Sequence, residues 1–269
     1  MDQNTGDALS SLYAVEGGVT SIFSTKATDY AASRPDYPTA LFEMLGGVYP
    51  PTAAASVVDI GSGTGLLTQG LLRMGYRVTA IEPNAEMRRA SDLLLGGIDG
   101  YSSAGGCAES IPVEAGSVDL ITAAQAFHWF EIERARAEFL RVLKPDGQVA
   151  LIWNDRVIED PLHAALDEVF GEFGGQKRAA LVVRENRSSV PRFFGSAGPR
   201  EFCWPHSHHL DEDGLLSLVF SRSYMPGRDS DEGRRVAERV RRIFWRFAVG
   251  GKVEARYRTT AFLGRPAAD

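Results

Sequence analysis

The sequence predicts an α/β protein with a doubly wound sheet and a helical cap. Between residues 56 and 153, short β-branched runs alternate with leucines at helical spacing. Strands that alternate with helices pair in parallel and are joined by right-handed crossovers. After Trp153 the alternation stops, and helical stretches replace it. We therefore expect one enlarged domain in which a sheet is followed by a helical insertion.

Length, composition and charge exclude several classes of protein. The 269 residues are 44% hydrophobic and 24% charged, which excludes collagen-like and wholly disordered chains. The net charge of −6 would repel a phosphate backbone, so no nucleic-acid partner is expected. Cys107 and Cys203 lack a CxxC spacing and are expected as reduced thiols. The sequence has neither an apolar run of the roughly 18 residues that a membrane span needs nor a leader pattern over Met1 to Ser11. We expect a cytoplasmic protein.

The first 50 residues are expected to form an N-terminal cap or lid. Residues 1 to about 25 are small and polar, as loosely ordered chain ends often are. Pro35 and Pro38 then hold the chain extended before a helix that runs to about Gly46.

Residues 51–154 are expected to form the ligand-binding α/β core. Its strands are predicted at 56–60, 77–81, about 100–105, 118–123 and 147–153. Its helices are predicted at 66–74, 85–95 and about 131–142. Asn84 is expected to cap the second of these helices, and Gly96 to end it.

The remaining chain is expected to supply a helical cap and the last strands of the sheet. Within 155–250, helices are predicted at about 161–173, 212–220 and 232–248, with one core strand near 200–205. In 251–269, apolar and charged residues alternate as they do along an edge strand. We expect these two segments to complete the sheet.

A glycine-rich turn follows the first predicted strand. In Val57–Gly65 three glycines occur as G-x-G-x-G, where backbone can approach a ligand closely. Glu82, 21 positions after Gly61, ends the next strand and suits ribose hydroxyls. The dinucleotide fingerprint is G-x-G-x-x-G, and Asp59 would repel its pyrophosphate while suiting an ammonium group. S-adenosylmethionine has that ammonium group, a ribose diol and no phosphate. The alternative is a tight turn that binds no ligand.

The chain resembles the class I S-adenosylmethionine-dependent methyltransferases of the type 11 group. The segments that carry the resemblance are Val57–Gly65, Ala80–Met87, Gly106–Pro112, Gly116–Ile121, Phe127–Phe130 and Phe139–Gly147. Two shorter segments, Tyr30–Pro38 and Ser221–Pro226, are similar to the trans-aconitate methyltransferase-like branch. The resemblance implies a Rossmann-like sheet with an antiparallel last strand, S-adenosylmethionine as cofactor, and methyl transfer.

The resemblance also implies roles for single residues. The implied cofactor contacts are Tyr30, Arg34, Asp59, Gly61, Ser62, Gly63, Gly65, Glu82, Pro83, Met87, Ala108, Glu109, Gln125, Ala126 and Phe127. Tyr30, Arg34 and Tyr37 are expected to close over the site. His128 follows the carboxyl end of a strand and is the catalytic candidate, as a substrate contact. The alternative for His128 is a packed histidine bonded to backbone.

Further residues are candidates for binding the acceptor. They are Tyr37, Trp129, Asn154, Arg156, His206, His208, Ser223, Tyr224 and Tyr257, and Arg222 is a second arginine that can pair with a carboxylate. In extended chain His206 and His208 point the same way, which suits two metal ligands. The sequence shows no third ligand, so no metal is predicted, and a solvated turn or a polar patch is the simpler interpretation.

The predicted activity is methyl transfer to a small molecule, of the kind found in secondary metabolism. A carboxylate or hydroxyl oxygen is the leading acceptor, because a carboxylate is nucleophilic as it stands. Methylation of carbon in an activated oxo acid is the alternative within the same class. A cyclisation or rearrangement without methyl transfer, and a binding module without catalysis, are alternatives of other classes. The sequence does not predict an oligomeric state.

Overall fold

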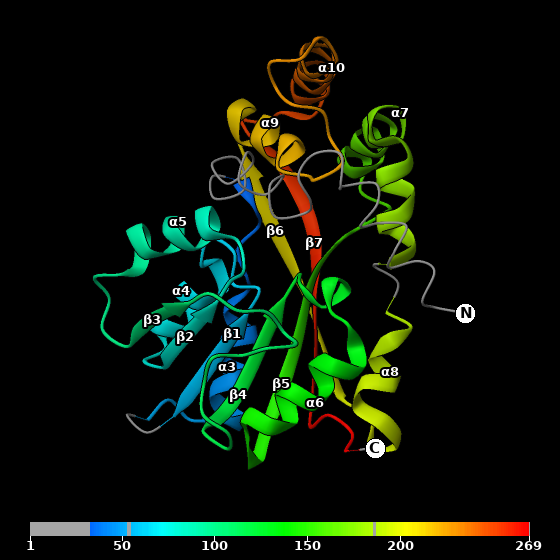
Figure 1. The fold of residues 1–269 in the computed structure, drawn as a ribbon. Coiled ribbons are helices and arrows are strands. Elements are labelled where there is room, and N and C mark those ends of the chain that lie inside the picture. The colour runs from blue at the N-terminus through cyan, green and yellow to red at the C-terminus, as the bar shows by residue number, and fades with distance from the viewer. Residues whose placement is uncertain (1–32, 53–54, 185–186, 269) are drawn as a thin grey trace. The chain divides into compact units, whose positions relative to one another are not determined.

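The computed structural model describes residues 33–52, 55–184 and 187–268 (Figure 1). Tyr30 lies outside these ranges. The chain divides into two compact units. We call Asp36–Asp155, Asn186–Pro205 and Arg258–Asp269 the sheet unit, and Met1–Pro35, Arg156–Glu185 and His206–Tyr257 the helical unit.

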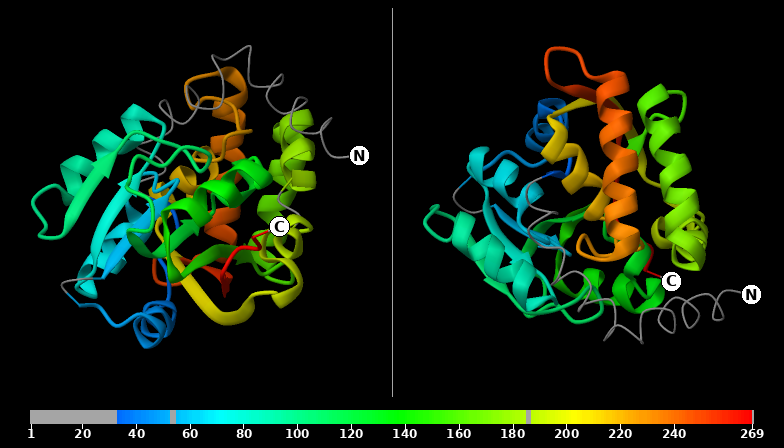
Figure 2. Two further views of the ribbon diagram at one scale, coloured as in Figure 1. Left: turned by 60° about the horizontal axis from the view of Figure 1, so that its bottom comes forward. Right: turned by 90° about the horizontal axis from the view of Figure 1, so that it is seen from above.

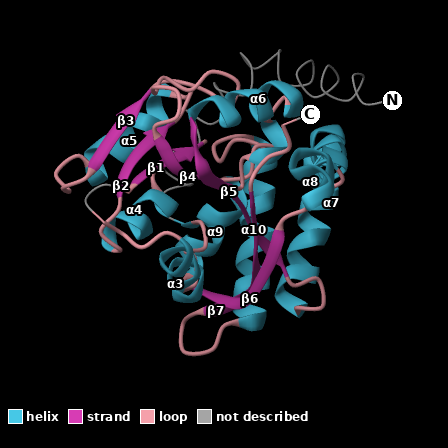
Figure 3. Cartoon of the chain, turned by 90° about the horizontal axis from the view of Figure 1, so that it is seen from below, coloured by secondary structure: helices cyan, strands magenta, loops and turns pink. Residues whose placement is uncertain are grey.

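The predicted doubly wound sheet is confirmed. Seven strands form one mixed sheet in the order β3-β2-β1-β4-β5-β7-β6, and its last strand is antiparallel. The strands are β1 Ser56–Ile60, β2 Arg77–Ile81, β3 Tyr101–Ala104, β4 Val118–Ala124, β5 Leu143–Arg156, β6 Arg200–Leu210 and β7 Val253–Gly264. Strands β1 to β5 pair in parallel, and Figure 3 shows them in a row. Strand β6 begins in the sheet unit and ends in the helical unit, whereas β7 begins in the helical unit and ends in the sheet unit.

Helices cover both faces of the sheet within the sheet unit. They are α3 Thr39–Val48, α4 Leu66–Arg73, α5 Ala85–Leu95, η1 Phe127–Trp129, α6 Ile132–Val142, α8 Ser189–Phe194 and η2 Gly195–Ala197. Val57 packs in one core with α3 and α4, whereas Val58 packs in another with α6 and α8. This division follows from the two-residue period of a strand, since successive side chains point to opposite faces.

Helix caps and breaks agree with the sequence in the first half of the chain. The Asn84 side chain accepts hydrogen bonds from the amides of Glu86 and Met87 at 2.9 Å, so the predicted cap of α5 is confirmed. Gly96 follows the last residue of that helix, as predicted. The short helix α8 was not predicted, because Pro191 lies within its six residues and obscures the helical pattern.

The helical unit packs three helices around a second core. They are α7 Pro161–Arg184, α9 Glu212–Phe220 and α10 Asp231–Phe247. Helix α10 lies against α7 and α9 (Figure 2) and buries Val236, Val240 and Phe244, as its apolar spacing predicts. Gly175 interrupts α7 with a non-helical backbone, close to the predicted end of that helix near residue 173. No helix in the described ranges combines the length and the apolar character needed to cross a membrane.

Two strands are longer than the sequence indicates. Strand β5 begins at Leu143 and not at residue 147, because the Pro145–Gly147 turn signal forms an irregularity in the pairing with β4. Strand β6 extends to Leu210, so His206 and His208 lie within a strand and the solvated turn is wrong. The alternating exposure along β6 places these two histidines on the same face.

His163 is a buried titratable group that the sequence did not single out. It lies in the first turn of α7 with 2% of its surface exposed, and its Nε2 is 2.9 Å from the carbonyl oxygen of Arg256. Burial, followed by the positive charge of Arg156, lowers the pKa of His163 to about 4. The helical unit therefore folds around a neutral imidazole.

This pKa predicts a loss of stability in acid. The native state favours the neutral imidazole, so its contribution is full above pH 6.5 and is lost as the pH falls through that value toward 4. The loss should approach about 3 kcal/mol. In His163→Gln, which keeps an amide donor near the Nε2 position, the unfolding free energy should fall less over this window. Urea denaturation of both proteins at several pH values tests this, and parallel pH profiles would contradict it.

Candidate functional site

The candidate site lies where the order of the strands reverses. From β1 the chain continues to β2 on one side, while β4 pairs with β1 on the other. Open α/β sheets bind ligands beyond the carboxyl ends of the strands at such a switch point. The predicted glycine turn follows β1 here, and the segment from Gln125 to Trp129 follows β4.

The glycine turn needs glycine because its backbone is left-handed and close to its neighbours. Gly61 has φ +67°, and a Cβ there would lie 2.7 Å from the Cβ of Ala126. Gly65 has φ +88° and is the N-cap of α4, where a Cβ would lie 2.6 Å from Ser91 and Leu95. Side chains at these positions would combine backbone strain with overlap. The turn therefore brings the ends of β1 and β4 into contact, and α4 begins at the residue after Gly65.

The amides of this turn are already bonded within the protein. Those of Gly61 and Ser62 donate to the carbonyl oxygen of Ile81 at 2.8 and 3.2 Å. The amide of Gly63 donates to Glu82 Oε2 at 2.9 Å, and that of Gly65 donates to the carbonyl oxygen of Ser62. A phosphate-binding loop instead directs such amides at its ligand. The turn is therefore poorly suited to a pyrophosphate, as the sequence predicts.

Asp59 places a buried carboxyl group next to the glycine turn. It is 1% exposed and accepts hydrogen bonds from the hydroxyls of Thr68 at 2.6 Å and Thr122 at 2.8 Å. Burial raises the pKa of Asp59 to about 6, although both hydroxyls oppose the shift and the charge of Glu82 adds to it. A nearby cation would therefore favour the ionised form.

Glu82 is held at the end of β2 by backbone amides. Its two oxygens accept from Gly63 and Asn84, each at 2.9 Å, and the side chain is 8% exposed. Burial raises its pKa, and the two amide hydrogen bonds act in the opposite direction. Each carboxylate oxygen has a second lone pair, so Glu82 in this orientation can also accept from a ribose diol.

The residues around the turn fit S-adenosylmethionine. Asp59 and Glu82 place two carboxyl groups beside the turn, which suit an ammonium group and a ribose diol, and the turn offers no phosphate cradle. Ser62 Oγ is buried without a hydrogen-bond partner among the described residues, so it has a hydrogen bond to offer a ligand.

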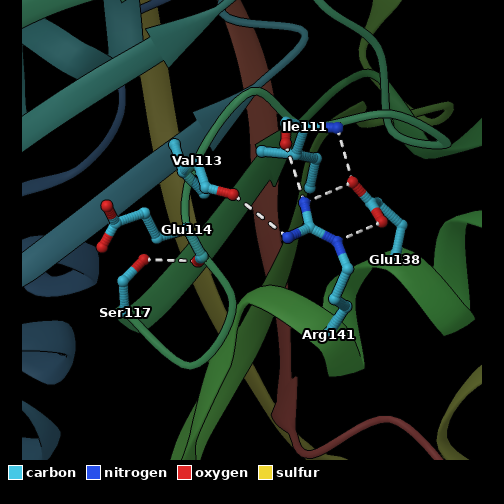
Figure 4. Close-up of polar contacts among 6 residues, drawn as sticks. All are labelled: Ile111, Val113, Glu114, Ser117, Glu138 and Arg141. Carbon is cyan, nitrogen blue, oxygen red and sulfur yellow. Dashed lines mark hydrogen bonds and ion pairs between the residues drawn. The ribbon is translucent and has the colours of Figure 1, made fainter.

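The segment after β3 is fastened to α6 by hydrogen bonds of Glu138 and Arg141 with backbone groups that the sequence did not reveal (Figure 4). Arg141 donates to both oxygens of Glu138 at 2.7 Å and to the carbonyl oxygens of Ile111 and Val113 at 2.9 and 3.1 Å. Glu138 also accepts from the Ile111 amide at 2.7 Å. These bonds hold a loop that carries two predicted cofactor contacts, Ala108 and Glu109.

The other predicted contacts near the adenine come from two segments. Met87, in the first turn of α5, is 3% exposed and Ala108 is 2% exposed, whereas Pro83 is exposed. Glu109 Oε1 accepts from the amide of Glu131 at 2.7 Å, which ties this loop to the start of α6. Their predicted contacts with the cofactor stay predictions.

The segment after β4 has a constrained backbone. Gln125 has φ +56°, and it is the one non-glycine residue in the left-handed region among those described. Ala126 is buried against the glycine turn, and the ring of Phe127 packs edge-on against Phe130, Trp153 and Phe193. The rings of His128 and Trp129 are half-buried, and their centroids lie 4.9 Å apart. Strain of this kind recurs at ligand-binding segments.

Two predicted acceptor contacts have structural partners in the sheet unit. Asn154 donates to the carbonyl oxygen of Asp36 at 3.1 Å and accepts from Thr259 at 2.6 Å. Its own carbonyl oxygen accepts from Gln125 at 3.2 Å. Tyr37 is 8% exposed and packs in the core beside α3. These contacts join the segment before α3 to β5 and β7.

The helical unit brings other predicted residues together. Arg156 and Tyr224 both contact the ring of Phe170. Burial raises the pKa of the Tyr257 hydroxyl, and the positive charges of Arg222, Arg34 and Arg156 act in the opposite direction.

The remaining candidates of this unit lie on β6 and after α9. On β6, His208 Nε2 lies 3.1 Å from the Ser33 carbonyl oxygen, and His206 is half-buried on the same face. Ser223 follows α9 and is half-buried. Within the part of the chain that the structure describes, no three His, Cys, Asp or Glu residues are placed to hold a metal ion.

Several residues that shape the site were missed at the level of sequence. Thr68 and Thr122 hold Asp59, and Arg88 donates to the carbonyl oxygen of Glu82 at 2.7 Å. The spacing of Glu138 and Arg141 indicates a helical ion pair, but the carbonyls that Arg141 reaches lie 28 and 30 positions away. Only the pairing of Glu138 with Arg141 within the helix could be recognised from the sequence.

Together the fold and the site define a class I S-adenosylmethionine-dependent methyltransferase. The class combines a seven-stranded sheet, a glycine turn at the switch point and a carboxylate at the end of the second strand. Comparison with known proteins gives the family. Residues 58–151 match the model of a methyltransferase domain.

Relatives of similar length support the same assignment. An uncharacterised methyltransferase of Mycobacterium tuberculosis is 33% identical over 221 residues, covering 82% of this chain and 84% of that protein. A methyltransferase-like protein of Schizosaccharomyces pombe is 28% identical over 244 residues, covering 89% and 93%. The chain belongs to the S-adenosylmethionine-dependent methyltransferase family, and S-adenosylmethionine is its cofactor.

A solved structure shares the fold. It is that of a protein from Anaeromyxobacter dehalogenans described as a type II methyltransferase, with a TM-score of 0.65, 24% identity, and coverage of 86% of this chain and 97% of that one. None of these relatives tests the trans-aconitate methyltransferase-like branch, which stays a prediction.

The pKa of Asp59 predicts how cofactor affinity depends on pH. Ionisation of a group with a pKa of about 6 becomes complete above that value, and the ionised form attracts the ammonium group of the cofactor. Binding of S-adenosylhomocysteine, which keeps this ammonium group, should be roughly tenfold weaker at about pH 5 than at about pH 7. Calorimetric titration measures it. Asp59→Asn should remove this pH dependence of the affinity, and Glu82→Gln should retain it. Equal affinity of the unmodified protein at both pH values would contradict the prediction.

The ion pair of Figure 4 predicts a positioning role for Arg141. Arg141→Lys keeps the charge but cannot make the paired bonds to Glu138 and reach both carbonyls, so the loop with Ala108 and Glu109 should loosen. Affinity for S-adenosylhomocysteine should fall by about three- to tenfold. Arg134→Lys, which changes an exposed arginine of α6 paired with Glu131 at the N-cap of that helix, is the matched control. Equal affinities in the two variants would rule out this role.

Proposed function

We propose that the protein methylates an oxygen atom of a small-molecule acceptor, with a carboxylate as the leading group. The observation that carries this proposal concerns the acidic groups near the carboxyl ends of the strands, because each of them is a predicted cofactor contact or already has a partner in the protein. Asp59 and Glu82 belong to the predicted cofactor contacts, Glu109 accepts from a backbone amide, and Asp155 is ion-paired with Arg187. A reaction that needs no strong base suits such a site best.

A carboxylate acceptor meets this requirement. Its oxygen is nucleophilic without losing a proton, whereas a carbon acceptor must first be converted to an enol or enolate. The sulfonium of the cofactor supplies an activated methyl group. The protein then has to hold the acceptor oxygen in line with that methyl group and exclude water. The aromatic rings of Phe127, Trp129 and Trp153 are suited to the second task.

A relative with a named acceptor also supports an oxygen. The malonyl-[acyl-carrier protein] O-methyltransferase of Methylococcus capsulatus is 37% identical over 105 residues, which is 38% of this chain and 37% of that protein. Its name assigns methyl transfer to oxygen. The match covers part of each chain, so it supports the type of acceptor atom and gives no acceptor for this protein.

Product mass tests the proposal directly. The full-length protein is incubated with S-adenosylmethionine and a panel of carboxylic acids, alcohols and oxo acids. We expect one acid to gain a single methyl group, alkali to remove it as an ester, and S-adenosylhomocysteine to accumulate. Glu82→Gln should lower the rate at least tenfold, because the ribose contact is weakened. A product with a methyl group on carbon, or an acceptor changed without any gain in mass, would refute the proposal.

His128 distinguishes a carboxylate from a hydroxyl acceptor. A hydroxyl group must lose its proton, and general base catalysis by histidine typically contributes 10² to 10⁴-fold. If the acceptor is a carboxylate, His128→Asn should lower kcat by less than about tenfold, since no proton is transferred. A loss on the scale of general base catalysis would place the reaction on a hydroxyl. His209→Phe, at an exposed histidine of β6, is the control.

A further inference from the structure

Helix α10 carries a row of exposed side chains on the side away from the core of the helical unit. Its buried side carries Val236, Val240 and Phe244. On the opposite side, four exposed residues follow one another at intervals of three, four and three positions, which is the spacing of residues that meet between two packed helices. These four residues, which we call the outer stripe, are Arg235, Glu238, Arg242 and Trp245.

Trp245 gives the outer stripe a large apolar surface. This side chain is 70% exposed, and its ring meets that of Phe244 edge-on, with centroids 5.4 Å apart. Val249, two residues after the end of α10, is 83% exposed as well. One exposed apolar side chain is ordinary on a protein surface, but tryptophan and arginine together are typical of the residues that contribute most to binding between proteins.

Two opposite charges of the outer stripe are available to a partner. Four other arginines of α10 pair within the helical unit: Arg234 with Asp231, Arg235 and Arg239 with Glu172, and Arg241 with Glu212. The side chains of Glu238 and Arg242, by contrast, form no ion pair or hydrogen bond with the residues that the structure describes. Both are exposed and four positions apart, where pairing within the helix would stabilise them only slightly.

The outer stripe is complementary to itself when two copies of α10 run antiparallel. With a two-fold axis level with Val240, Glu238 of each copy faces Arg242 of the other, because these positions are equally far from the axis. Arg235 and Trp245 are also equally far from it, so each arginine faces the other copy's indole ring, which suits a cation–π contact. A parallel pair would instead place each residue against its own copy, and like charges would meet.

We propose that the outer stripe of α10 binds the outer stripe of a second copy of this chain, with the two helices antiparallel. The contact uses the same surface on both copies, so association ends at the dimer. Two helix faces make a small interface, and we therefore expect a dimer that dissociates at micromolar concentrations. The proposal is independent of the proposed function, because no residue of the outer stripe is a predicted contact of the cofactor or the acceptor.

Sedimentation velocity of the full-length protein measures this association. Between about 1 and about 100 μM, the sedimentation coefficient should rise from that of a monomer toward that of a dimer, with a Kd on the order of 10 μM. Trp245→Ala should weaken the dimer roughly tenfold, because it removes the large apolar surface of the stripe. Higher salt should also weaken it, since both charge pairs lie at an exposed contact.

Charge reversal tests the antiparallel register. Glu238→Arg and Arg242→Glu each replace two attractive pairs by two repulsive ones, because the two-fold axis repeats the change, and each should weaken the dimer at least tenfold. Both changes in one chain should restore it. An equimolar mixture of the two single variants should also associate, since one chain then has two positive residues facing two negative residues of the other. Glu168→Arg, at an exposed glutamate of α7, is the matched control.

Three results would refute the proposed dimer. The unmodified protein may stay monomeric at about 100 μM, where the proposal requires a dimer. Folded Glu238→Arg and Arg242→Glu may dimerise as tightly as Glu168→Arg, which would place the contact on another surface. The single variants may be monomeric both alone and when mixed, which would show that these two positions do not face each other. Thermal unfolding of each variant shows that it is folded.

Discussion

The sheet unit depends on the hydrogen bonds of one buried carboxyl group. Asp59 lies on β1, Thr68 on α4 and Thr122 on β4, where it is the register partner of Asp59. The two hydroxyls therefore tie together the strand before the glycine turn, the helix after it and the strand across the switch point. Burial of this group is unfavourable when it is ionised, which its raised pKa records. A cationic ligand bound nearby would stabilise the ionised form of Asp59 and so offset the unfavourable burial of its charge.

The glycine turn follows from this arrangement. With β1 and β4 held in register, the Cβ of Ala126 fills the space that a side chain at position 61 would need. The backbone must then turn in a left-handed conformation, and its amides bond to Ile81 and Glu82 instead of to a ligand. The amides of the turn are consequently engaged within the protein, and the polar side chains beside it that suit a cationic ligand are carboxyl groups. This is the physical difference between the present site and a pyrophosphate-binding turn of nearly the same sequence.

Sequence reasoning predicted the sheet unit well because its signals are local. A strand, a glycine turn, a capping Asn84 and the start of the next helix occur within a few residues of each other, so each can be recognised in a short window. The predicted limits of a strand were wrong where a turn signal in the sequence lies inside a segment that pairs with a neighbouring strand. Pro145 and Gly147 indicate a turn, yet the strand passes through them because both sides pair with β4. Likewise the histidines of β6 look like a turn until pairing extends the strand.

The helical unit was predicted less completely because its contacts join distant segments. Phe170 lies on α7, Arg156 ends β5, Arg222 follows α9 and Tyr257 lies on β7, and no spacing rule connects them. The sequence suggested the arginines and tyrosines one at a time, as groups able to bind a carboxylate. It gave no indication of the buried ring that arranges them, because a phenylalanine inside an apolar helix has the same pattern whether it packs against leucine or guanidinium. Such a cluster of charged and aromatic side chains arises only from folding, so it can be recognised only from the contacts of the folded chain.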